Sequence, residues 1–280
     1  MSTVTRSLSV DATDGVALAL HQWAQDGAGA AIFYIHGIQS HAGWLFETGP
    51  ALARRGVSFF AADRRGSGRS GGMRGHLASS AQVFDDYLRC IARVRSLTGH
   101  LPLLVLGQSF GGSILAGLEA SGPLRADALL FCAPALGQQR ARHDHDRLVA
   151  LRRRSGTALA PLSLEDGDYT GEERYLRFMA EDPLMLRSVT EATRATMVGI
   201  EDSYMEAREA PENAVATFVA IPEDDPIIDL AAAGRVIARR YPGHVARRFA
   251  TSWHYLEFTA IREAYWDWVA QCALRRGVQA

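Results

Sequence analysis

Residues 103–120 read LLVLGQSFGGSILAGLEA and hold the strongest local signal in the chain. The apolar run Leu103–Leu106 predicts a buried strand, and the small and apolar residues at the end of the segment predict a helix. Between them lies Gly-Gln-Ser-Phe-Gly, which matches the pattern Gly-x-Ser-x-Gly. Gly107 and Gly111 permit a tight turn between strand and helix, and such a turn would present the Ser109 hydroxyl as a nucleophile.

The same kind of apolar run recurs at wide intervals on both sides of this segment. Runs with little alternation are typical of strands buried on both faces, as in a parallel sheet. These runs are Ala31–Ile35, Val57–Ala62, Ala128–Ala133 and Ala214–Ile221. Helix-like segments separate them, among them Trp44–Arg55 and Ser80–Leu97. The alternation predicts an α/β fold with helices on both faces of a mostly parallel sheet. Two further strands, Thr3–Val10 and Val16–Trp23, are expected to form a hairpin with its turn at Asp14-Gly15.

The alternation stops after Ala135 and resumes near Asn213. Between these points the sequence predicts polar helices and no buried strand. We therefore expect a core domain formed by residues 1–136 and 211–280, with a helical cap inserted at 137–210. An insertion after a strand of a parallel sheet would cover the crevice at the carboxyl ends of the strands, where such sheets bind ligands.

The composition excludes several kinds of chemistry and partner. The chain has 280 residues, 48% of them hydrophobic, and a net charge of −1, so a nucleic-acid partner is not expected. All 30 basic residues are arginine, which excludes any mechanism that needs a lysine. The three cysteines are widely spaced and favour a reduced, cytoplasmic setting without disulfides. We expect no metal, no cofactor and no stable membrane association, since metal-ligand spacings, a signal peptide and uninterrupted apolar spans are all missing.

A serine hydroxyl needs a general base, in this setting a histidine oriented by a carboxylate. In a fold of this kind the chain order is serine, acid, histidine. Of the four histidines after Ser109, two lie in the insertion and His244 begins an expected strand. His254 directly follows that strand, where a loop at the carboxyl edge of the sheet would place it. His254 is therefore the predicted base.

The acid should follow the preceding strand, which ends in Pro-Glu-Asp-Asp-Pro at 222–226. Three carboxylates compete there. Asp225 is the predicted acid because Pro226 fixes the turn after it, and Asp224 is the alternative. The acid would orient the imidazole of His254 and stabilise its charged form.

An acyl-transfer site also needs donors for an oxyanion. The backbone N–H of Phe110, next to the nucleophile, is one candidate, and the N–H of Ile38 in the loop after the first parallel strand is the other. His36 in the same loop is expected to connect loops and not to act as a base. The predicted substrate contacts near these groups are His36, Gly37, Gln39, Gln108 and Trp253.

Taken together, these motifs resemble the α/β-hydrolases, in particular the branch of monoglyceride lipases and bacterial lysophospholipases. The resemblance rests on His36–Trp44, Asp63–Ser70, Gly107–Gly111, Asp225 and His254, and it extends to a cap-like segment at 175–184. It implies the α/β-hydrolase fold, a Ser-Asp-His triad and a cap over the acyl pocket. Two positions depart from the family pattern: Pro222 and Trp253 stand where glycine or another small residue is usual. The substrate is therefore not carried over.

These features predict a cofactor-independent serine hydrolase that cleaves a carboxylic ester through an acyl-enzyme on Ser109. Leu148, Leu151, Leu159 and Leu162 of the insertion are expected to line a pocket for a short or medium acyl chain. One alternative is a thioesterase or cyclase that acts on a carrier-bound acyl chain, with an acyl carrier protein docking at Arg152–Arg154. An alternative of another class is a non-catalytic protein of this fold that binds a small ligand.

Overall fold

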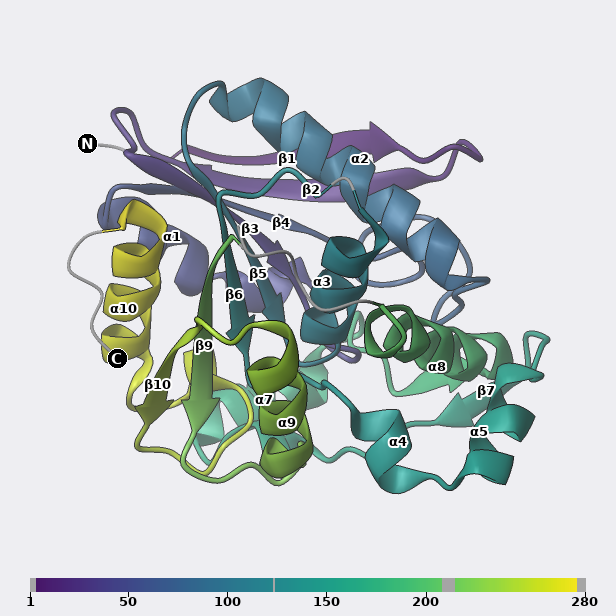
Figure 1. Cartoon of the computed structure of the whole chain (residues 1–280). Helices are drawn as coiled ribbons and strands as arrows, with labels where there is room; N and C mark the ends of the chain where they lie inside the picture. The colour runs from purple at the N-terminus through teal and green to yellow at the C-terminus, as the bar shows by residue number, and fades with distance from the viewer. Residues whose placement is uncertain (1–3, 123, 208–214, 276–280) are drawn as a thin grey trace.

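A single eight-stranded sheet runs through the centre of the computed structural model, which describes residues 4–122, 124–207 and 215–275 (Figure 1). The strand order is β1-β2-β4-β3-β5-β6-β9-β10. β1 and β2 form an antiparallel hairpin, β2 is also antiparallel to β4, and the remaining pairs are parallel. The strands are β1 (Val4–Asp11), β2 (Ala17–Ala24), β3 (Ala30–Ile35), β4 (Val57–Ala62), β5 (Leu103–Gln108), β6 (Ala128–Cys132), β9 (Ala216–Pro222) and β10 (Val245–Phe249). The predicted mostly parallel sheet is confirmed.

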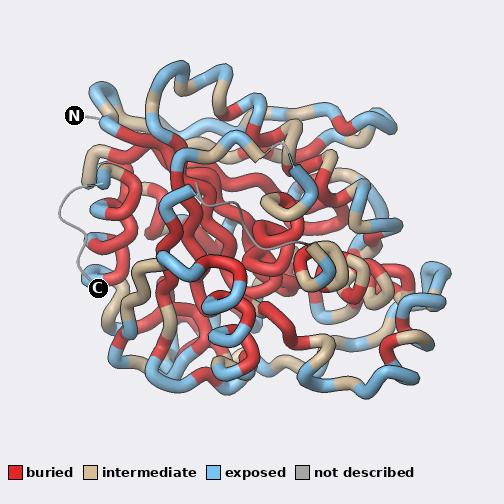
Figure 2. The backbone as a smooth tube through the Cα atoms, viewed as in Figure 1, coloured by how far each residue is buried: buried red, intermediate tan, exposed pale blue. Residues whose placement is uncertain are grey.

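Helices cover both faces of the sheet because the central strands are apolar on both sides. In β3, Phe33 packs into the core beneath α2, α3 and α9, while its neighbours Ile32 and Tyr34 pack into the core beneath α1 and α10. Figure 2 shows the resulting buried interior. These helices are α1 (Thr48–Arg54), α2 (Ser80–Thr98), α3 (Phe110–Ser121), α9 (Leu230–Arg240) and α10 (Arg262–Leu274). None of the helices in the described ranges is both long and apolar enough to cross a membrane.

The expected strands agree with the structure to within a few residues at their ends. The expected first residues Thr3 and Ala214 lie outside the described residues. Gly15 adopts a φ of +80° in the turn between β1 and β2, as the predicted hairpin requires. The prediction of one continuous helix at Trp44–Arg55 was wrong. The structure has a 3-10 turn, η1 (Ala42–Leu45), followed by α1. A second 3-10 turn, η2 (Leu256–Phe258), precedes α10.

The segment between β6 and β9 holds five helices in the described residues: α4 (Gln138–Arg142), α5 (His145–Arg152), α6 (Asp166–Tyr169), α7 (Glu173–Glu181) and α8 (Glu191–Met205). It also holds two short antiparallel strands, β7 (Leu159–Pro161) and β8 (Ser188–Thr190). These strands add to the helices that were expected here, but neither is buried along its whole length, so the expectation of no buried strand is not contradicted. Each strand has three residues, too few to produce a recognisable hydrophobic pattern. The expected boundary at 136/137 falls in a turn after β6, and the one at 210/211 lies outside the described residues.

Candidate active site

Ser109 occupies a strained turn at the carboxyl end of β5. Its φ is +54° and its ψ is −121°, a conformation that L-residues rarely adopt, and α3 starts at the next residue. The flanking glycines are sterically required. A Cβ on Gly111 would lie 1.9 Å from the carbonyl oxygen of Ile35, and a Cβ on Gly107 would lie 2.5 Å from that of Gly111. The Gly-x-Ser-x-Gly spacing is therefore what lets the turn pack against β3.

Asp225 and His254 form a buried pair beside this turn. His254 Nδ1 lies 2.8 Å from Asp225 Oδ2, and neither side chain is exposed. The other carboxylate oxygen, Oδ1, accepts the N–H groups of Ile227 and Ile228 at 2.8 and 3.0 Å. These bonds hold the carboxylate toward the imidazole. The carboxylate of Asp224, the alternative acid, instead accepts the backbone N–H of Asp225 at 2.9 Å.

The second ring nitrogen of His254 contacts Gln108, the residue before Ser109. The side-chain amide nitrogen of Gln108 lies 3.3 Å from His254 Nε2. With Nδ1–H donated to Asp225, Nε2 of the neutral ring is an acceptor, so the Gln108 amide donates to it. Within the part of the chain that the structure describes, the Ser109 hydroxyl makes no hydrogen bond. The structure thus pairs Asp225 with His254 and brings His254 to the residue adjoining Ser109.

Two backbone N–H groups next to Ser109 have no acceptor within the described residues. They belong to Phe110 and Ile38, and both residues line the same cavity as Ser109. The carbonyl oxygens of Gly37 and Ile38 accept the guanidinium of Arg64 at 3.0 and 2.9 Å. Because buried Arg64 fixes these carbonyls, the loop after β3 is held in one orientation and the Ile38 N–H stays available for an anion.

His36 connects the loops after β3 and β4, as expected from the sequence. Its Nε2 accepts the backbone N–H of Arg64 at 2.9 Å, and its Nδ1 donates to the Gly37 carbonyl at 2.8 Å. Burial, reinforced by the Arg64 guanidinium, lowers the pKa of His36 to about 3. The ring therefore stays neutral near pH 7 and keeps both bonds. Nearby, buried Asp63 contacts the partly buried His21 at 3.1 Å, a pair that sequence reasoning did not single out.

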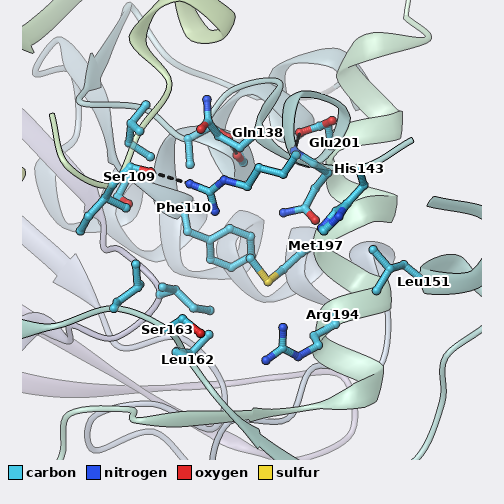
Figure 3. Close-up of a pocket in the computed structure, with 18 residues that line it drawn as sticks. Ser109, Phe110, Gln138, His143, Leu151, Leu162, Ser163, Arg194, Met197 and Glu201 are labelled. Carbon is cyan, nitrogen blue, oxygen red and sulfur yellow. Dashed lines mark hydrogen bonds between the residues drawn. The ribbon is translucent and has the colours of Figure 1, made fainter. Parts of the chain in front are cut away.

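A cavity of about 280 Å³ opens beside Ser109 and lies between the sheet and the insertion (Figure 3). Its lining residues are Ile38, Ser109, Phe110, Ser113, Ala135, Gln138, Gln139, Arg142, His143, Leu151, Leu162, Ser163, Leu164, Arg194, Met197, Glu201, Ile227 and Ile228. Of the four leucines expected to line a pocket, Leu151 and Leu162 do. Leu148 instead packs into a buried cluster with Leu151 and Val198, and Leu159 is 56% exposed.

The predicted substrate contacts are not among the residues that line this cavity. Gly37 and Gln108 lie against the Ser109 turn: a Cβ on Gly37 would lie 2.7 Å from Gln108 Oε1 and 3.4 Å from Ser109 Cβ. Gln39 is buried and its Oε1 accepts the hydroxyl of Tyr169 at 2.7 Å. The prediction that Trp253 contacts the substrate in this cavity was wrong. Trp253 is 38% exposed and packs against Gly171 in a separate surface hollow, so its ring does not reach the cavity.

The cavity wall contains residues that sequence reasoning missed. Arg142, Arg194 and Met197 all line it. Arg194 and Met197 are three residues apart on α8, and this spacing places both on one face of the helix. The spacing alone could not predict these contacts, because the sequence does not show which face of α8 lies against the cavity. Among the residues the structure describes, no three side chains of His, Cys, Asp or Glu lie close enough together to hold a metal ion.

The comparisons with known proteins agree with this geometry. A family model described as "Serine aminopeptidase, S33" matches residues 27–258, which cover the sheet from β3 to β10, the insertion and the candidate site residues. The chain belongs to this family. Its α/β-hydrolase fold, predicted from the motifs, is confirmed. In sequence, the chain is 30% identical over 123 residues to a monoacylglycerol lipase of Mycolicibacterium smegmatis, a match covering 44% of each chain.

A monoglyceride lipase of Rattus norvegicus is also 30% identical, over 125 residues that cover 44% of this chain and 41% of the rat protein. The chain thus matches less than half the length of these curated relatives. Solved structures show that the similarity in fold extends over almost all of this chain. A soluble variant of monoglyceride lipase from Saccharomyces cerevisiae, in complex with a substrate analogue, superposes with a TM-score of 0.82 at 16% identity, covering 100% of this chain and 97% of that one. A thermostable carboxyl esterase from Bacillus coagulans gives 0.73 at 12% identity, with coverage of 96% and 98%.

Proposed function

We propose that this S33 family member is a cofactor-independent serine hydrolase that cleaves a carboxylic ester, with Ser109, Asp225 and His254 as its catalytic triad. The observation that carries the proposal is the buried 2.8 Å contact between Asp225 and His254, next to a serine held in a strained turn. Ser109 also lies at a cavity large enough for a small substrate. The lipases and esterases among the relatives support the same reaction class.

In the proposed reaction, the Ser109 oxygen attacks the ester carbonyl while His254 takes the hydroxyl proton. Asp225 holds the Nδ1–H of the ring and stabilises the imidazolium. The N–H groups of Ile38 and Phe110 donate to the oxyanion, and one such donor is worth roughly 3–4 kcal/mol in other serine hydrolases. Collapse of the tetrahedral intermediate breaks the ester C–O bond, and His254 gives its proton to the departing alcohol. Water then repeats the sequence on the acyl-enzyme and releases the acid.

We also propose that residues 137–210 act as a cap over the substrate. The lining of the cavity supports this proposal, because the core and the proposed cap both contribute to it. Ile38 and Phe110 come from the sheet side. The segment between β6 and β9 contributes Leu151, Leu162 and Met197. The apolar part of this wall fits a short or medium acyl chain. An ester with such a chain is therefore the proposed substrate.

The carrier-bound alternative receives less support from the surface. Arg152 pairs with Asp202 at 2.6 Å, and Arg154 pairs with Glu191. Two members of the Arg152–Arg154 run thus already have acidic partners within the insertion. An acidic carrier protein docking there would have to compete with these internal ion pairs.

The test is labelling with a fluorophosphonate probe, followed by assays on a panel of p-nitrophenyl esters and acyl thioesters. We expect Ser109 to be labelled and esters to be hydrolysed, with both lost in Ser109→Ala and His254→Ala. Faster turnover of thioesters than of matched oxygen esters would favour the thioesterase alternative. A folded wild-type protein that is neither labelled nor active would contradict the proposal and favour a ligand-binding role.

A further inference from the structure

Two arginine side chains in the cavity wall lack an acidic partner. Arg194 donates to the carbonyl of Pro161 at 2.8 Å, and Arg142 donates to the carbonyl of Ile227. In the described part of the chain, neither guanidinium lies within ion-pair distance of a carboxylate. The Nε of Arg194 is moreover buried without any hydrogen-bond partner. Leaving a buried cationic donor unpaired costs free energy, so this atom needs an explanation.

Most other arginines of the insertion in the described residues are paired with carboxylates, and the exceptions Arg147 and Arg153 are exposed and do not line the cavity. The arginines of this segment with carboxylate partners are Arg140, Arg152, Arg154, Arg174, Arg177 and Arg187. Acidic residues are thus plentiful on the insertion. The two guanidinium groups that line the cavity are nevertheless left with carbonyl partners only.

The remaining ionisable groups in the wall do not cancel this positive charge. Glu201 accepts the backbone N–H groups of Gln139 and Arg140, each at 2.8 Å, and its carboxylate lies 3.5 Å from the Arg140 guanidinium. Burial and the nearby guanidinium groups of Arg147 and Arg142 lower the pKa of His143, so its ring is neutral near pH 7. The cavity therefore keeps an excess of positive charge.

Arg194 and Ser109 lie apart along the cavity, whereas the guanidinium of Arg142 donates to the Ile227 carbonyl beside Asp225, at the catalytic end. Figure 3 shows Ser109 on one side of the drawn residues and His143, Leu151 and Arg194 on the opposite side, with the Phe110 ring and Met197 between them. A bound molecule would thus meet, in order, the nucleophile, an apolar stretch and a cationic end.

We propose that the substrate is an ester whose acyl chain carries an anionic group, a carboxylate in the simplest case, held by Arg194. This inference rests on the proposed esterase function. A carboxylate would satisfy the buried Nε of Arg194 through charge-assisted hydrogen bonds, while the methylene groups contact Phe110 and Met197. The anion belongs to the acyl part because that part stays bound through both chemical steps, whereas the alcohol must leave after the first.

The first experiment compares monomethyl esters of C4–C10 dicarboxylic acids with methyl esters of monocarboxylic acids of equal length. We expect wild-type protein to have the higher kcat/KM for the half-esters. In Arg194→Gln, the ratio of the two kcat/KM values should fall by about tenfold or more, the effect of losing a charged hydrogen-bond donor. Arg194→Lys should recover part of the ratio. The control is Arg153→Gln, which removes an exposed charge outside the cavity and should keep the ratio.

Equal kcat/KM values for both ester classes, or a ratio that Arg194→Gln leaves unchanged, would overturn the inference while ester hydrolysis itself stands. A preference for acetate esters of ω-hydroxy acids would overturn the assignment of the anion to the acyl part. The second experiment separates binding from turnover by calorimetric titration of monomethyl adipate and monomethyl suberate into Ser109→Ala. Binding that an added Arg194→Gln weakens at least tenfold would support the anion site, and the same binding together with no ester turnover by the wild-type protein would contradict the esterase proposal alone.

Discussion

At the scale of single residues, Asp224 and Asp225 show how adjacent carboxylates receive different roles. Asp225 accepts two backbone N–H groups and contacts His254, whereas Asp224 accepts the N–H of its neighbour. The first arrangement fixes a carboxylate against the imidazole, and the second forms a local turn. This difference depends on the direction of the backbone after β9 and not on the residue type.

Substituting the two acids one at a time tests this assignment. Asp225→Asn should lower kcat by roughly 10⁴, because the amide can no longer orient the correct tautomer of His254. Asp224→Asn should stay within about tenfold of wild type, since it loses only one local hydrogen bond. Both kcat values are measured on the same p-nitrophenyl ester, with circular dichroism as the control for folding. The reverse order of effects would make Asp224 the acid.

Glu257 is a second residue whose environment is built by distant segments. Its carboxyl is buried, with Oε1 accepting the Tyr34 hydroxyl at 2.7 Å and Oε2 lacking a partner. Burial raises the pKa of Glu257 from its ordinary value near 4.5 to about 7. The folded state therefore holds this proton more tightly than the unfolded state. Its contribution to stability is complete below pH 4.5 and is lost as the pH rises through about 7.

The corresponding prediction compares wild type with Glu257→Gln, which cannot ionise. Relative to the variant, wild type should lose up to about 3 kcal/mol of unfolding free energy between pH 4.5 and pH 8, the equivalent of the pKa change. Urea denaturation across this range measures the difference, and the comparison cancels the contributions of other groups such as His36. A difference that does not change with pH would show that Glu257 titrates normally.

At the scale of elements, the strand–turn–helix unit of β5 and α3 is constrained because the backbone at the start of α3 lies very close to the backbone of β3. Gly111→Ala would place a methyl group 1.9 Å from the Ile35 carbonyl oxygen, so either β3 or the start of α3 must move. We expect a loss of more than about 3 kcal/mol in unfolding free energy, or failure to fold, together with loss of esterase activity.

Gly234 in α9 supplies the matched control for this prediction. A Cβ there has no atom within 4 Å, and the residue lies inside a helix. Gly234→Ala should therefore stabilise the protein by about 0.5–1 kcal/mol and leave activity unchanged. Unfolding midpoints in urea give both values. Equal stability of the two variants would mean that the turn can relax around a larger residue.

At the scale of the whole molecule, the distribution of apolar surface bears on the physical state of the substrate. Among the described residues, the large hydrophobic side chains that are well exposed come from separate segments of the chain: Phe46, Met73, Leu97, Leu159, Val215 and Trp253. An enzyme that works at a lipid interface needs a continuous apolar helix face. α5, at the outer part of the insertion, buries Leu148 and Leu151 and is otherwise largely polar.

We therefore predict that rates saturate below the critical micelle concentration of the substrate and do not rise above it. Initial rates on p-nitrophenyl esters of increasing chain length, measured on both sides of the micellar transition, test this. Flotation with liposomes is the second measurement, with unbound protein as the expected result. A sharp increase in rate at the transition, or recovery of the protein with the liposomes, would favour a lipid-interface enzyme.

The sequence by itself determined the features that arise within a single segment. The apolar runs of β3, β4 and β5 predicted the buried sheet because these strands are covered on both faces. The glycines around Ser109 predicted its turn because the Gly-x-Ser-x-Gly pattern lies within five residues, although the contact that requires Gly111 is with Ile35 of β3. The resemblance added the fold and the chain order of the candidate triad.

Only the tertiary structure decided what depends on contacts between distant segments. It selected the carboxylate that faces His254, removed Trp253 from the cavity, and revealed two strands too short for any periodic pattern. It also brought Arg142 and Arg194, from helices α4 and α8, to one cavity without acidic partners. Such pairings arise from how the insertion packs on the sheet, and local residue spacing carries no information about that packing.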